Sequence, residues 1–455
     1  MKKKNIATAA VIELTFSRGE KKVKVCKFGG SSVASADQIR KVKAILDSDS
    51  KRTVVVVSAP GKRVSSDEKI TDMLYKCASL VDGGHSCEAV FSKIESRYLE
   101  IARSLFLDEK EVKAELECVK TNIEKGTGAA YAASRGEYLS ARIIARYLGW
   151  NFLDSEKTVV IGEDNRIEDI TYTQLRNAVK KGEKYVIPGF YGTSLSGDIT
   201  TFSRGGSDIT GAIAAAALDA SVYENWTDVS GVYSSDPRVV KNAHVIDELS
   251  YREVREFSEV GASVFHEEAI APCVEKGIPI NIRNTNSPDD KGTVIRKTVG
   301  HRGVVGVSAR GGLGRIYCQK LMFFKESGMR HRILSLMHIY GIKPCYTLYG
   351  CDSIAWYFDT KQADNIDLEE MKERIKDEFN LNEIDIRKGY AVVGLVGTGI
   401  EETMEYVDAL SALRDKGIHP ASVSLGGSWT TFVIGIDEKR KDEAVNLISN
   451  RIFNK

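Results

Sequence analysis

Runs of hydrophobic residues alternate with longer amphipathic stretches along about the first 300 residues of the chain. Residues 53–59 (TVVVVSA) form a β-branched run without polar alternation, which is typical of a strand covered on both faces, and 23–28 (VKVCKF) indicates another buried strand. A helix is predicted over 36–46, and several more fill 67–148. Further strands, separated by helical patterns, are predicted at 185–190, 221–226 and 278–283. This alternation predicts an α/β sandwich with a mostly parallel sheet.

The pattern changes after Arg296, where a Gly-rich and basic stretch over 297–315 marks a domain boundary. Beyond it, two units of similar size share the order strand–helix–strand–strand–helix, which indicates a tandem repeat of small α+β modules. Their predicted elements are strands 315–319, 344–349 and 354–358 with a helix over 328–340, then strands 390–395, 422–425 and 430–435 with helices over 402–416 and from 439. We therefore divide the chain into an N-terminal extension, one α/β domain and two modules, at 1–22, 23–298, 312–384 and 385–455.

Composition narrows the class of protein. A chain of 455 residues has room for about three domains. Lys and Arg total 64 and Asp and Glu total 63, so a formal net charge of +1 argues against bulk binding to nucleic acid or an anionic membrane. The 8 cysteines include no C-x-x-C pair and no zinc-type spacing, which indicates free thiols in a reducing compartment. Glu13 interrupts the apolar part of the N-terminus, and no apolar run approaches the ~20 residues of a membrane span. We expect a cytoplasmic protein.

The first motif with chemical content is KFGGSS at 27–32. A strand delivers Lys27 at its carboxyl end, the edge where open α/β sheets bind ligands. Gly29 and Gly30 allow the backbone to approach an anion closely, and successive N–H groups can form an anion-binding nest. The alternative is an ordinary strand-to-helix turn with a solvated lysine. Phosphate binding is only slightly favoured by this motif alone.

A second motif, TTFSRGGSD at 200–208, precedes a smooth helix of small residues. Arg204 beside a helix N-terminus would concentrate positive potential suited to a carboxylate or phosphate. Asp208 fits an anion site only if it orients a Lys or Arg; otherwise it, or Ser207, simply caps the helix. The cap alone leaves the arginine and the paired glycines unexplained.

Three further segments carry polar groups near predicted element ends. WTDVSGVYSSDPR at 226–238 follows a strand and offers groups for a sugar, a base and a phosphate, although a hairpin with a Pro turn explains it better when it is taken alone. Glu137 stands at a helix start, where it could hold an ammonium group or serve the helix dipole, and Thr71 offers a free hydroxyl. GLVGTG at 394–399 has the spacing G-x-x-G-x-G rather than G-x-G-x-x-G, so we interpret it as a tight turn and not a dinucleotide site.

Together these motifs resemble the aspartate kinase family of the amino acid kinase superfamily. The match extends from Lys24 to Ile295 and rests on KFGGSS (27–32), VVVSAPGK (55–62) with Thr71 after it, RGE (135–137), GFYG (189–192), SRGGSD (203–208), TDVSGVYSSDPR (227–238) and PINIRNT (279–285). The tail resembles the paired ACT modules of that family, which are ferredoxin-like regulatory domains that bind amino acids. No dehydrogenase domain follows Lys455, so the chain resembles the monofunctional form. The resemblance implies an αβα kinase domain followed by two ACT modules.

The same resemblance implies the activity. Members of the family phosphorylate the side-chain carboxylate of L-aspartate with ATP, giving 4-phospho-L-aspartate and ADP, the first step toward lysine, threonine and methionine. It implies catalytic roles for Lys27 and Asp208. The residues implied at ATP are Lys27, Phe28, Gly29, Gly30, Ser31, Thr227, Asp228, Tyr233 and Arg238. The residues implied at aspartate are Ser58, Thr71, Glu137, Phe190, Arg204 and Ser207. Mg²⁺ is expected on the phosphates, with no metal ligands from the protein.

Two departures from the family pattern limit what carries over. The family commonly has a lysine that reaches the nucleotide in a G-A-K-V-x-H-P segment, but here Ser263 takes its place in GASVFHEEA (261–269). The effector segment of the first module reads LYGCDS (348–353) and does not name its ligand, so lysine and threonine are both expected candidates. The family resemblance also implies a homodimer or larger oligomer assembled through the ACT modules.

Two other functions remain open at this point. Acetylglutamate, glutamate, carbamate and uridylate kinases share the sheet and the early glycine loop, but they are not expected to combine SRGGSD, RGE and two tail modules. A protein that has lost catalysis and only senses amino acids is a different class. Lys27, Arg204 and Asp208 argue against it, and Ser263 argues weakly for it.

Overall fold

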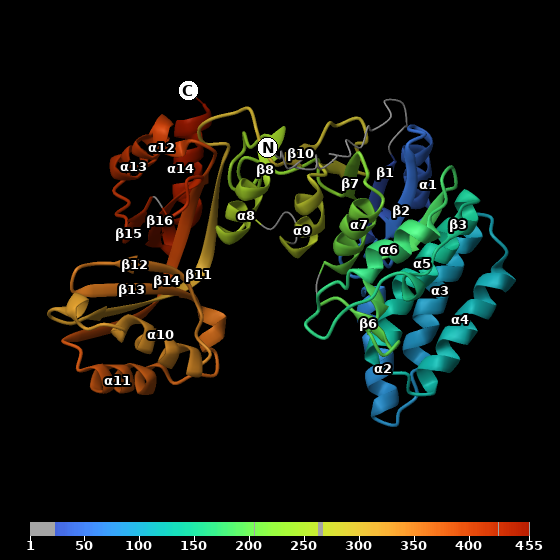
Figure 1. Ribbon diagram of the computed structural model, residues 1–455, viewed down its shortest axis with the longest axis horizontal. Helices are drawn as coiled ribbons and strands as arrows, with labels where there is room; N and C mark the ends of the chain where they lie inside the picture. The colour runs from blue at the N-terminus through green and yellow to red at the C-terminus, as the bar shows by residue number, and fades with distance from the viewer. Residues whose placement is uncertain (1–22, 204, 263–266, 426, 455) are drawn as a thin grey trace, which may run out of the picture.

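The structure is a computed structural model that describes residues 23–203, 205–262, 267–425 and 427–454. The α/β body and the C-terminal body lie side by side (Figure 1). The α/β body is built on an eight-stranded sheet of order β3-β4-β2-β1-β7-β9-β10-β8, parallel throughout except between β9 and β10. Its strands are β1 (Lys24–Phe28), β2 (Arg52–Val57), β3 (Asn151–Phe152), β4 (Tyr185–Pro188), β7 (Val222–Thr227), β8 (Glu248–Ser250), β9 (Ile280–Asn284) and β10 (Thr293–Arg296). The predicted mostly parallel sheet is confirmed.

Helices cover both faces of this sheet, because successive side chains of a strand point to opposite faces and both sets are apolar. Cys26 and Phe28 of β1 belong to the core under the first group of helices, whereas Val25 belongs to the core under the second. The first group is α1 (Ala36–Asp47), α2 (Ile70–Asp82), α3 (Glu88–Ser104), α4 (Glu109–Glu124) and α5 (Ala129–Leu148). The second group is α6 (Ile170–Ala178), α7 (Gly206–Ala217), α8 (Tyr251–Glu259) and α9 (Glu267–Lys276). The result is the αβα sandwich expected from the sequence.

The small residues of α7 let this helix lie close to the middle of the sheet. A Cβ atom placed on Gly211 would stand 2.6 Å from the hydroxyl oxygen of Tyr223 in β7, so only glycine fits there. The N-terminus of α7 thereby meets the carboxyl ends of the central strands, where the candidate site lies. A two-stranded ribbon, β5 (Tyr191–Thr193) and β6 (Ile199–Thr201), precedes the helix.

The C-terminal body is built on one six-stranded antiparallel sheet of order β12-β13-β11-β14-β16-β15. Its strands are β11 (Gly306–Gln319), β12 (Pro344–Tyr349), β13 (Ser353–Asp359), β14 (Glu383–Val396), β15 (Ser422–Ser424) and β16 (Thr431–Asp437). Its α-helices are α10 (Met329–Ile339), α11 (Leu368–Phe379), α12 (Ile400–Thr403), α13 (Glu405–Asp415) and α14 (Lys441–Phe453). Each half has its own hydrophobic core, so two modules are present within one continuous sheet.

The two modules share strands instead of following one another along the chain. The second half of β11, residues 313–319, pairs with β13 in the first module, while its first half, 306–310, pairs with the end of β14 in the second. The second module therefore takes a strand from a segment that precedes the start predicted at residue 312. The division predicted between residues 384 and 385 falls inside β14. The single helix predicted over 402–416 is also wrong, because Met404 adopts φ +55° and separates α12 from α13.

Helix α8 joins the two bodies. The buried Glu253 carboxylate accepts hydrogen bonds from Ser250 in its own helix cap, from His301 in the connection and from Thr398 in the C-terminal body. Thr398 belongs to the GLVGTG turn, whose glycines serve close packing: a Cβ on Gly394 would stand 2.4 Å from Val260 of the same junction. Residues 394–396 of the motif complete β14, and only 397–399 form the tight turn that the sequence indicated. The motif docks the second module on the α/β body.

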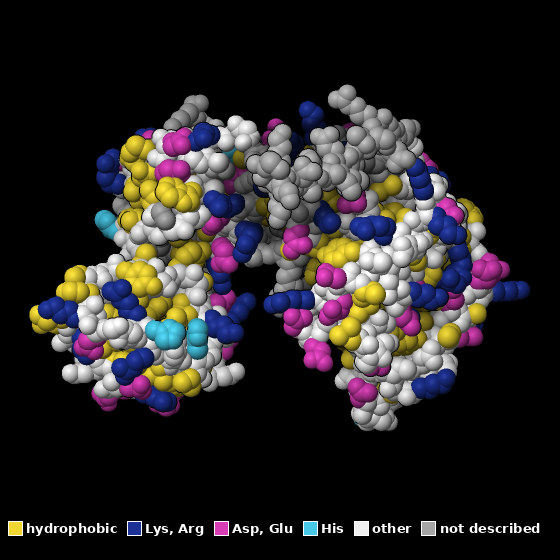
Figure 2. Space-filling view, viewed as in Figure 1, with side chains coloured by type: hydrophobic (Ala, Val, Ile, Leu, Met, Phe, Trp, Pro, Cys, Tyr) yellow, Lys and Arg dark blue, Asp and Glu magenta, His cyan; other side chains and the backbone are white. Residues whose placement is uncertain are grey.

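The surface carries both signs of charge. Figure 2 shows Lys and Arg interspersed with Asp and Glu over both bodies on the visible face, in keeping with the formal net charge of +1. All 8 cysteines lie within the described residues and none forms a disulfide. Among the described helices, none combines the length and apolar character needed to cross a membrane.

Candidate active site

The glycine loop after β1 is held by backbone hydrogen bonds from two neighbouring segments. The N–H of Gly29 donates to the Trp226 carbonyl at 3.0 Å, and the N–H of Gly61 donates to the Gly30 carbonyl at 2.8 Å. A Cβ on Gly30 would lie 3.0 Å from the Ala59 carbonyl oxygen, so a side chain there would push the loop away from the end of β2. The chain then makes a 3₁₀ turn over Gly30–Val33 before α1. The Phe28 side chain is buried and stacks on Trp226, so only its backbone can face a ligand.

Lys27 projects from β1 toward the start of α7. Its Nζ lies 2.6 Å from Oδ1 of Asp208, and the same oxygen accepts a hydrogen bond of 2.9 Å from the Asn225 amide. Lys27 is only 8% exposed. The helix cap is Gly205, with φ +61°, and no side chain of the described residues caps α7. The alternative in which Asp208 or Ser207 serves as the cap is therefore wrong: the Asp208 carboxylate pairs with Lys27 instead.

A cavity of about 340 Å³ opens beside this ion pair. It is lined by Lys27, Ser58, Lys69, Thr71, Asp72, Glu137, Phe190, Gly205, Gly206, Ser207 and Asp208. Both predicted catalytic residues and five of the six predicted aspartate residues therefore share one cavity. The sixth, Arg204, lies outside the described residues. Lys69 and Asp72 also line this cavity but were not predicted. Both stand within two residues of Thr71 at the start of α2, and this closeness to a predicted residue is the sequence signal that could have identified them.

Glu137 places an unpaired carboxylate oxygen at this cavity. The side chain is 5% exposed, and Oε2 has no hydrogen-bond partner among the described residues. Burial raises the pKa of Glu137 to about 8, although backbone N–H groups of Ala59 and Glu137 itself oppose the shift. Its position depends on Gly136, because a Cβ there would lie 2.8 Å from Cβ of Ala59. A cationic group of a ligand would supply the missing partner.

The GFYG segment packs against the first turn of α7. Phe190 has φ +76°, an uncommon conformation for a bulky residue, and its N–H donates to the Thr210 hydroxyl at 3.2 Å. A Cβ on Gly189 would lie 2.6 Å from Ser207, and one on Gly206 would lie 2.8 Å from Cα of Phe190. These contacts fix the wall of the cavity that Phe190 and Ser207 form.

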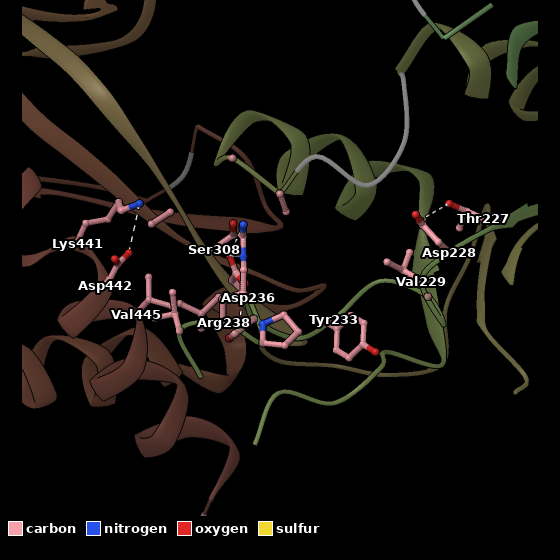
Figure 3. Close-up of a pocket in the computed structure, with 18 residues that line it drawn as sticks. Thr227, Asp228, Val229, Tyr233, Asp236, Arg238, Ser308, Lys441, Asp442 and Val445 are labelled. Atoms are coloured by element: carbon pink, nitrogen blue, oxygen red, sulfur yellow. Dashed lines mark hydrogen bonds and ion pairs between the residues drawn. The ribbon is translucent and has the colours of Figure 1, made fainter. Parts of the chain in front are cut away.

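A second cavity, of about 490 Å³, lies between the α/β body and the second module (Figure 3). Four predicted nucleotide residues, Thr227, Asp228, Tyr233 and Arg238, line it. Arg238 is exposed and pairs with Asp236 at 2.7 Å. The other predicted nucleotide residues belong to the β1 loop. Gly261 and Ala262 also line this cavity, whereas Ser263 lies outside the described residues.

The wall contributed by the second module was not predicted. Ser308, Lys441, Asp442 and Val445 line the same cavity, and Figure 3 shows them at the end opposite Thr227 and Asp228. No sequence signal connects these residues with 227–238, because the two segments meet only when the bodies dock.

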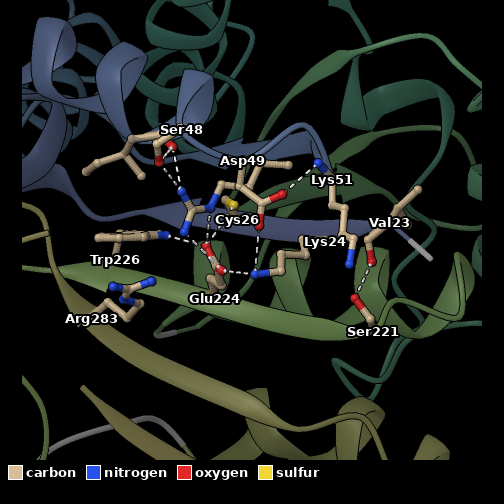
Figure 4. A network of polar contacts seen from close by, with 12 residues as sticks. Val23, Lys24, Cys26, Ser48, Asp49, Lys51, Ser221, Glu224, Trp226 and Arg283 are labelled. Carbon is tan, nitrogen blue, oxygen red and sulfur yellow. Dashed lines mark hydrogen bonds and ion pairs between the residues drawn. The ribbon is translucent and has the colours of Figure 1, made fainter. Parts of the chain in front are cut away.

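A buried ionic network supports the loop from the other face of the sheet (Figure 4). The Glu224 carboxylate is 2.8 Å from Arg52 and 3.0 Å from Lys24, and it accepts a hydrogen bond of 3.0 Å from the Trp226 indole. Burial raises the pKa of Glu224, but the hydrogen bonds and charges of Arg52 and Lys24 outweigh it and hold that pKa below its usual range. The network fixes Trp226, whose carbonyl holds Gly29.

Comparisons with known proteins agree with this geometry. Residues 22–284 match the amino acid kinase family. Aspartokinase 3 of Bacillus subtilis is 34% identical over 450 residues, which cover 95% of this chain and 99% of that protein. The crystal structure of Clostridium acetobutylicum aspartate kinase superposes with a TM-score of 0.88 at 39% identity, covering 94% of this chain and all of that one. Escherichia coli aspartokinase III in complex with aspartate and ADP shares the fold, with a TM-score of 0.75 at 23% identity over 95% of this chain and 100% of that chain. This chain belongs to the amino acid kinase family, among its aspartokinases.

Proposed function

We propose that this protein transfers the γ-phosphoryl group of ATP to the side-chain carboxylate of L-aspartate, giving 4-phospho-L-aspartate and ADP, in the cytoplasm. One observation carries the proposal: a single cavity gathers the Lys27–Asp208 pair and a buried Glu137 oxygen that has no partner among the described residues. An amino acid with a second carboxylate matches this set of groups. Its ammonium satisfies Glu137 while its side chain reaches Lys27.

The substrate is held at both ends of its backbone. Glu137 binds the ammonium group, and Arg204 binds the α-carboxylate in the bidentate manner typical of arginine. The hydroxyls of Ser58, Thr71 and Ser207 supply further hydrogen bonds, and Phe190 forms the wall. This arrangement leaves the side-chain carboxylate as the part of aspartate nearest the lysine.

The transfer needs no general base. A carboxylate has a reference pKa near ~4 and is already ionised at pH 7. One of its oxygens forms a bond to the γ-phosphorus while the bond from that phosphorus to the β,γ-bridging oxygen breaks, and ADP leaves with the electron pair. Two anions must be brought together in line, so the contribution of the protein is positioning and charge. Lys27, aimed by Asp208, meets the charge on the transferring group.

The nucleotide occupies the second cavity. Thr227, Asp228, Tyr233 and Arg238 contact the nucleoside part and its nearest phosphate, and the loop of Phe28, Gly29, Gly30 and Ser31 receives the phosphates beside Lys27. The described residues hold no cluster of three or more His, Cys, Asp or Glu suited to a metal ion. We expect Mg²⁺ to be held mainly by the phosphates of ATP and by water, where it would neutralise phosphate charge.

The regulatory modules bind an end-product amino acid, lysine or threonine, and assemble the protein into at least a dimer. The support is the pair of edge strands, β12 and β15, which the described chain leaves at the two margins of the sheet. Exposed edges favour pairing with a second copy. We further propose that the catalytic domain spans 23–298, with 1–22 as an extension, and that the modules correspond to 312–384 and 385–455 with the strand exchange described above.

A coupled assay of ADP release tests the activity. Aspartate should support turnover, while glutamate, N-acetylglutamate and succinate should support little or none, and Lys27→Ala should abolish the signal. Turnover with another acid and not with aspartate would favour a different member of the superfamily. No turnover with any acid, together with binding of lysine or threonine, would favour a sensor without catalysis.

A further inference from the structure

Asn225 occupies a position on β7 next to the reacting lysine. Strands β1 and β7 are parallel neighbours, and Lys27 pairs in register with Asn225. Both side chains reach Asp208 on α7: the Asn225 amide donates to Oδ1 at 2.9 Å, and Lys27 Nζ lies 2.6 Å from the same oxygen. One carboxylate oxygen therefore receives two donors from two adjacent strands.

The presence of an amide here is unfavourable for packing alone. Asn225 is 4% exposed and lies in the centre of a parallel sheet, where aliphatic residues normally stand. Its Oδ1 is buried and has no partner among the described residues. An aliphatic residue of similar size would avoid this unpaired acceptor. The hydrogen bond to Asp208 is the contact that accounts for the amide.

The neutral amide is also the appropriate chemical choice. A lysine or arginine at residue 225 would compete with Lys27 for Asp208, and an aspartate would repel that carboxylate. Asparagine adds a donor without adding charge. It fixes the rotation of the Asp208 carboxylate and leaves the ion pair with Lys27 intact.

On the basis of the proposed function, we infer that Asn225 is a positioning residue for phosphoryl transfer, which holds Asp208 so that Asp208 aims the Lys27 ammonium at the transferring group. A lysine side chain has a long flexible stem, and its direction depends on the anion that it meets. When that anion turns, the ammonium follows it away from the reaction line. A misplacement of about 1 Å can cost about 10²-fold in rate.

The decisive measurement is steady-state kinetics of Asn225→Leu, with Asn281→Leu as the matched control. Asn281 lies on the adjacent strand β9, in register with Glu224 rather than with Asn225. We expect kcat of Asn225→Leu to fall between about tenfold and about 10²-fold, while KM for aspartate and for ATP changes by less than about threefold. The control should keep the parental kcat. A kcat for Asn225→Leu within twofold of the parent overturns the inference.

Asn225→Asp provides a second readout that a merely structural role would not move. It places a second carboxylate against Asp208, and two such groups cannot both ionise easily. The kcat of this variant should rise as the pH falls, because a shared proton restores a donor to Asp208. A pH profile that superposes on the parent overturns the inference, even where Asn225→Leu fails to fold. The proposed activity is tested in the same experiment by ADP release from the parent with aspartate, so the two failures are distinguishable.

Discussion

The proposed contact between Glu137 and aspartate should make aspartate binding depend on pH, by an amount that follows from the pKa of Glu137. Its buried carboxyl group has a pKa of about 8, so about nine-tenths of the free protein carries a proton on Glu137 at pH 7. The proposed contact with the ammonium of aspartate requires the ionised carboxylate. Binding at pH 7 should therefore release about 0.9 proton for each aspartate bound, and about half a proton at pH 8.

The same ionisation sets the affinity. The ionised fraction of Glu137 rises from about 3% at pH 6.5 to about half at pH 8, so the dissociation constant of aspartate should fall about 15-fold over this interval. The free protein should show the opposite trend in stability. Because the folded-state pKa exceeds the unfolded value of 4.5, stability is highest below pH 4.5 and falls as the pH rises through about 8. The ionised, unpaired Glu137 costs about 5 kcal/mol above that pH.

Isothermal titration calorimetry in buffers of different ionisation enthalpy measures both the number of protons released and the dissociation constant of aspartate. Glu137→Gln should bind aspartate weakly at every pH and without proton release, and its melting temperature above pH 8 should exceed that of the parent. Glu117→Gln, at an exposed residue of α4, is the matched control and should behave as the parent. Tight binding at pH 7 with no proton released would refute the reasoning, because Glu137 would then not face the ammonium as a carboxylate.

Four further perturbations test other parts of the structure. Lys27→Ala should lower kcat by about 10²–10³-fold with little change in the aspartate KM, and a parental kcat would remove Lys27 from the transfer step. Gly206→Ala should raise the aspartate KM more than the ATP KM, because its Cβ would lie 2.8 Å from Cα of Phe190 and would displace the wall of the proposed aspartate cavity. Equal changes in both KM values would contradict the assignment of this wall to aspartate. Glu253→Ala should lower the free energy of unfolding by about 3–5 kcal/mol in urea titrations, because it leaves His301 and Thr398 without their buried acceptor. An unchanged midpoint of unfolding would show that this carboxylate does not hold the junction. The pKa of Glu224 is lowered in the folded state, so its contribution to stability is present above pH 4.5 and is lost as the pH falls below that. Glu224→Gln should therefore make the free energy of unfolding fall less steeply at acid pH. The same pH dependence of unfolding in variant and parent would contradict the stabilising role of the network.

The sequence by itself predicted most elements of the α/β body and the composition of the two modules. Residues 53–59 and 221–226 form strands within one residue or two of their predicted bounds, as β2 and β7, because uninterrupted apolar runs report burial on both faces directly. The motifs around Lys27 and Ser207 were recognised because each pairs a chemically active side chain with glycines at an element end. The prediction that Glu137 stands at a helix start is wrong, because α5 begins at Ala129 and Glu137 lies in its middle. The family resemblance was needed to predict that these distant segments form one site.

The tertiary structure alone decided how the segments meet. The exchange of strand halves between β11 and β14, the junction of Glu253 with Thr398, and the wall of Lys441 and Asp442 at the second cavity join residues 64 to 215 positions apart. A hydrophobic pattern records whether a residue is buried, but not which partner buries it. The same limit applies to Asn225 and to the pKa of Glu137. The residue type alone does not reveal the environment of an amide or a carboxyl group. Only the surrounding atoms determine whether it is hydrated, paired or left with an unpaired oxygen.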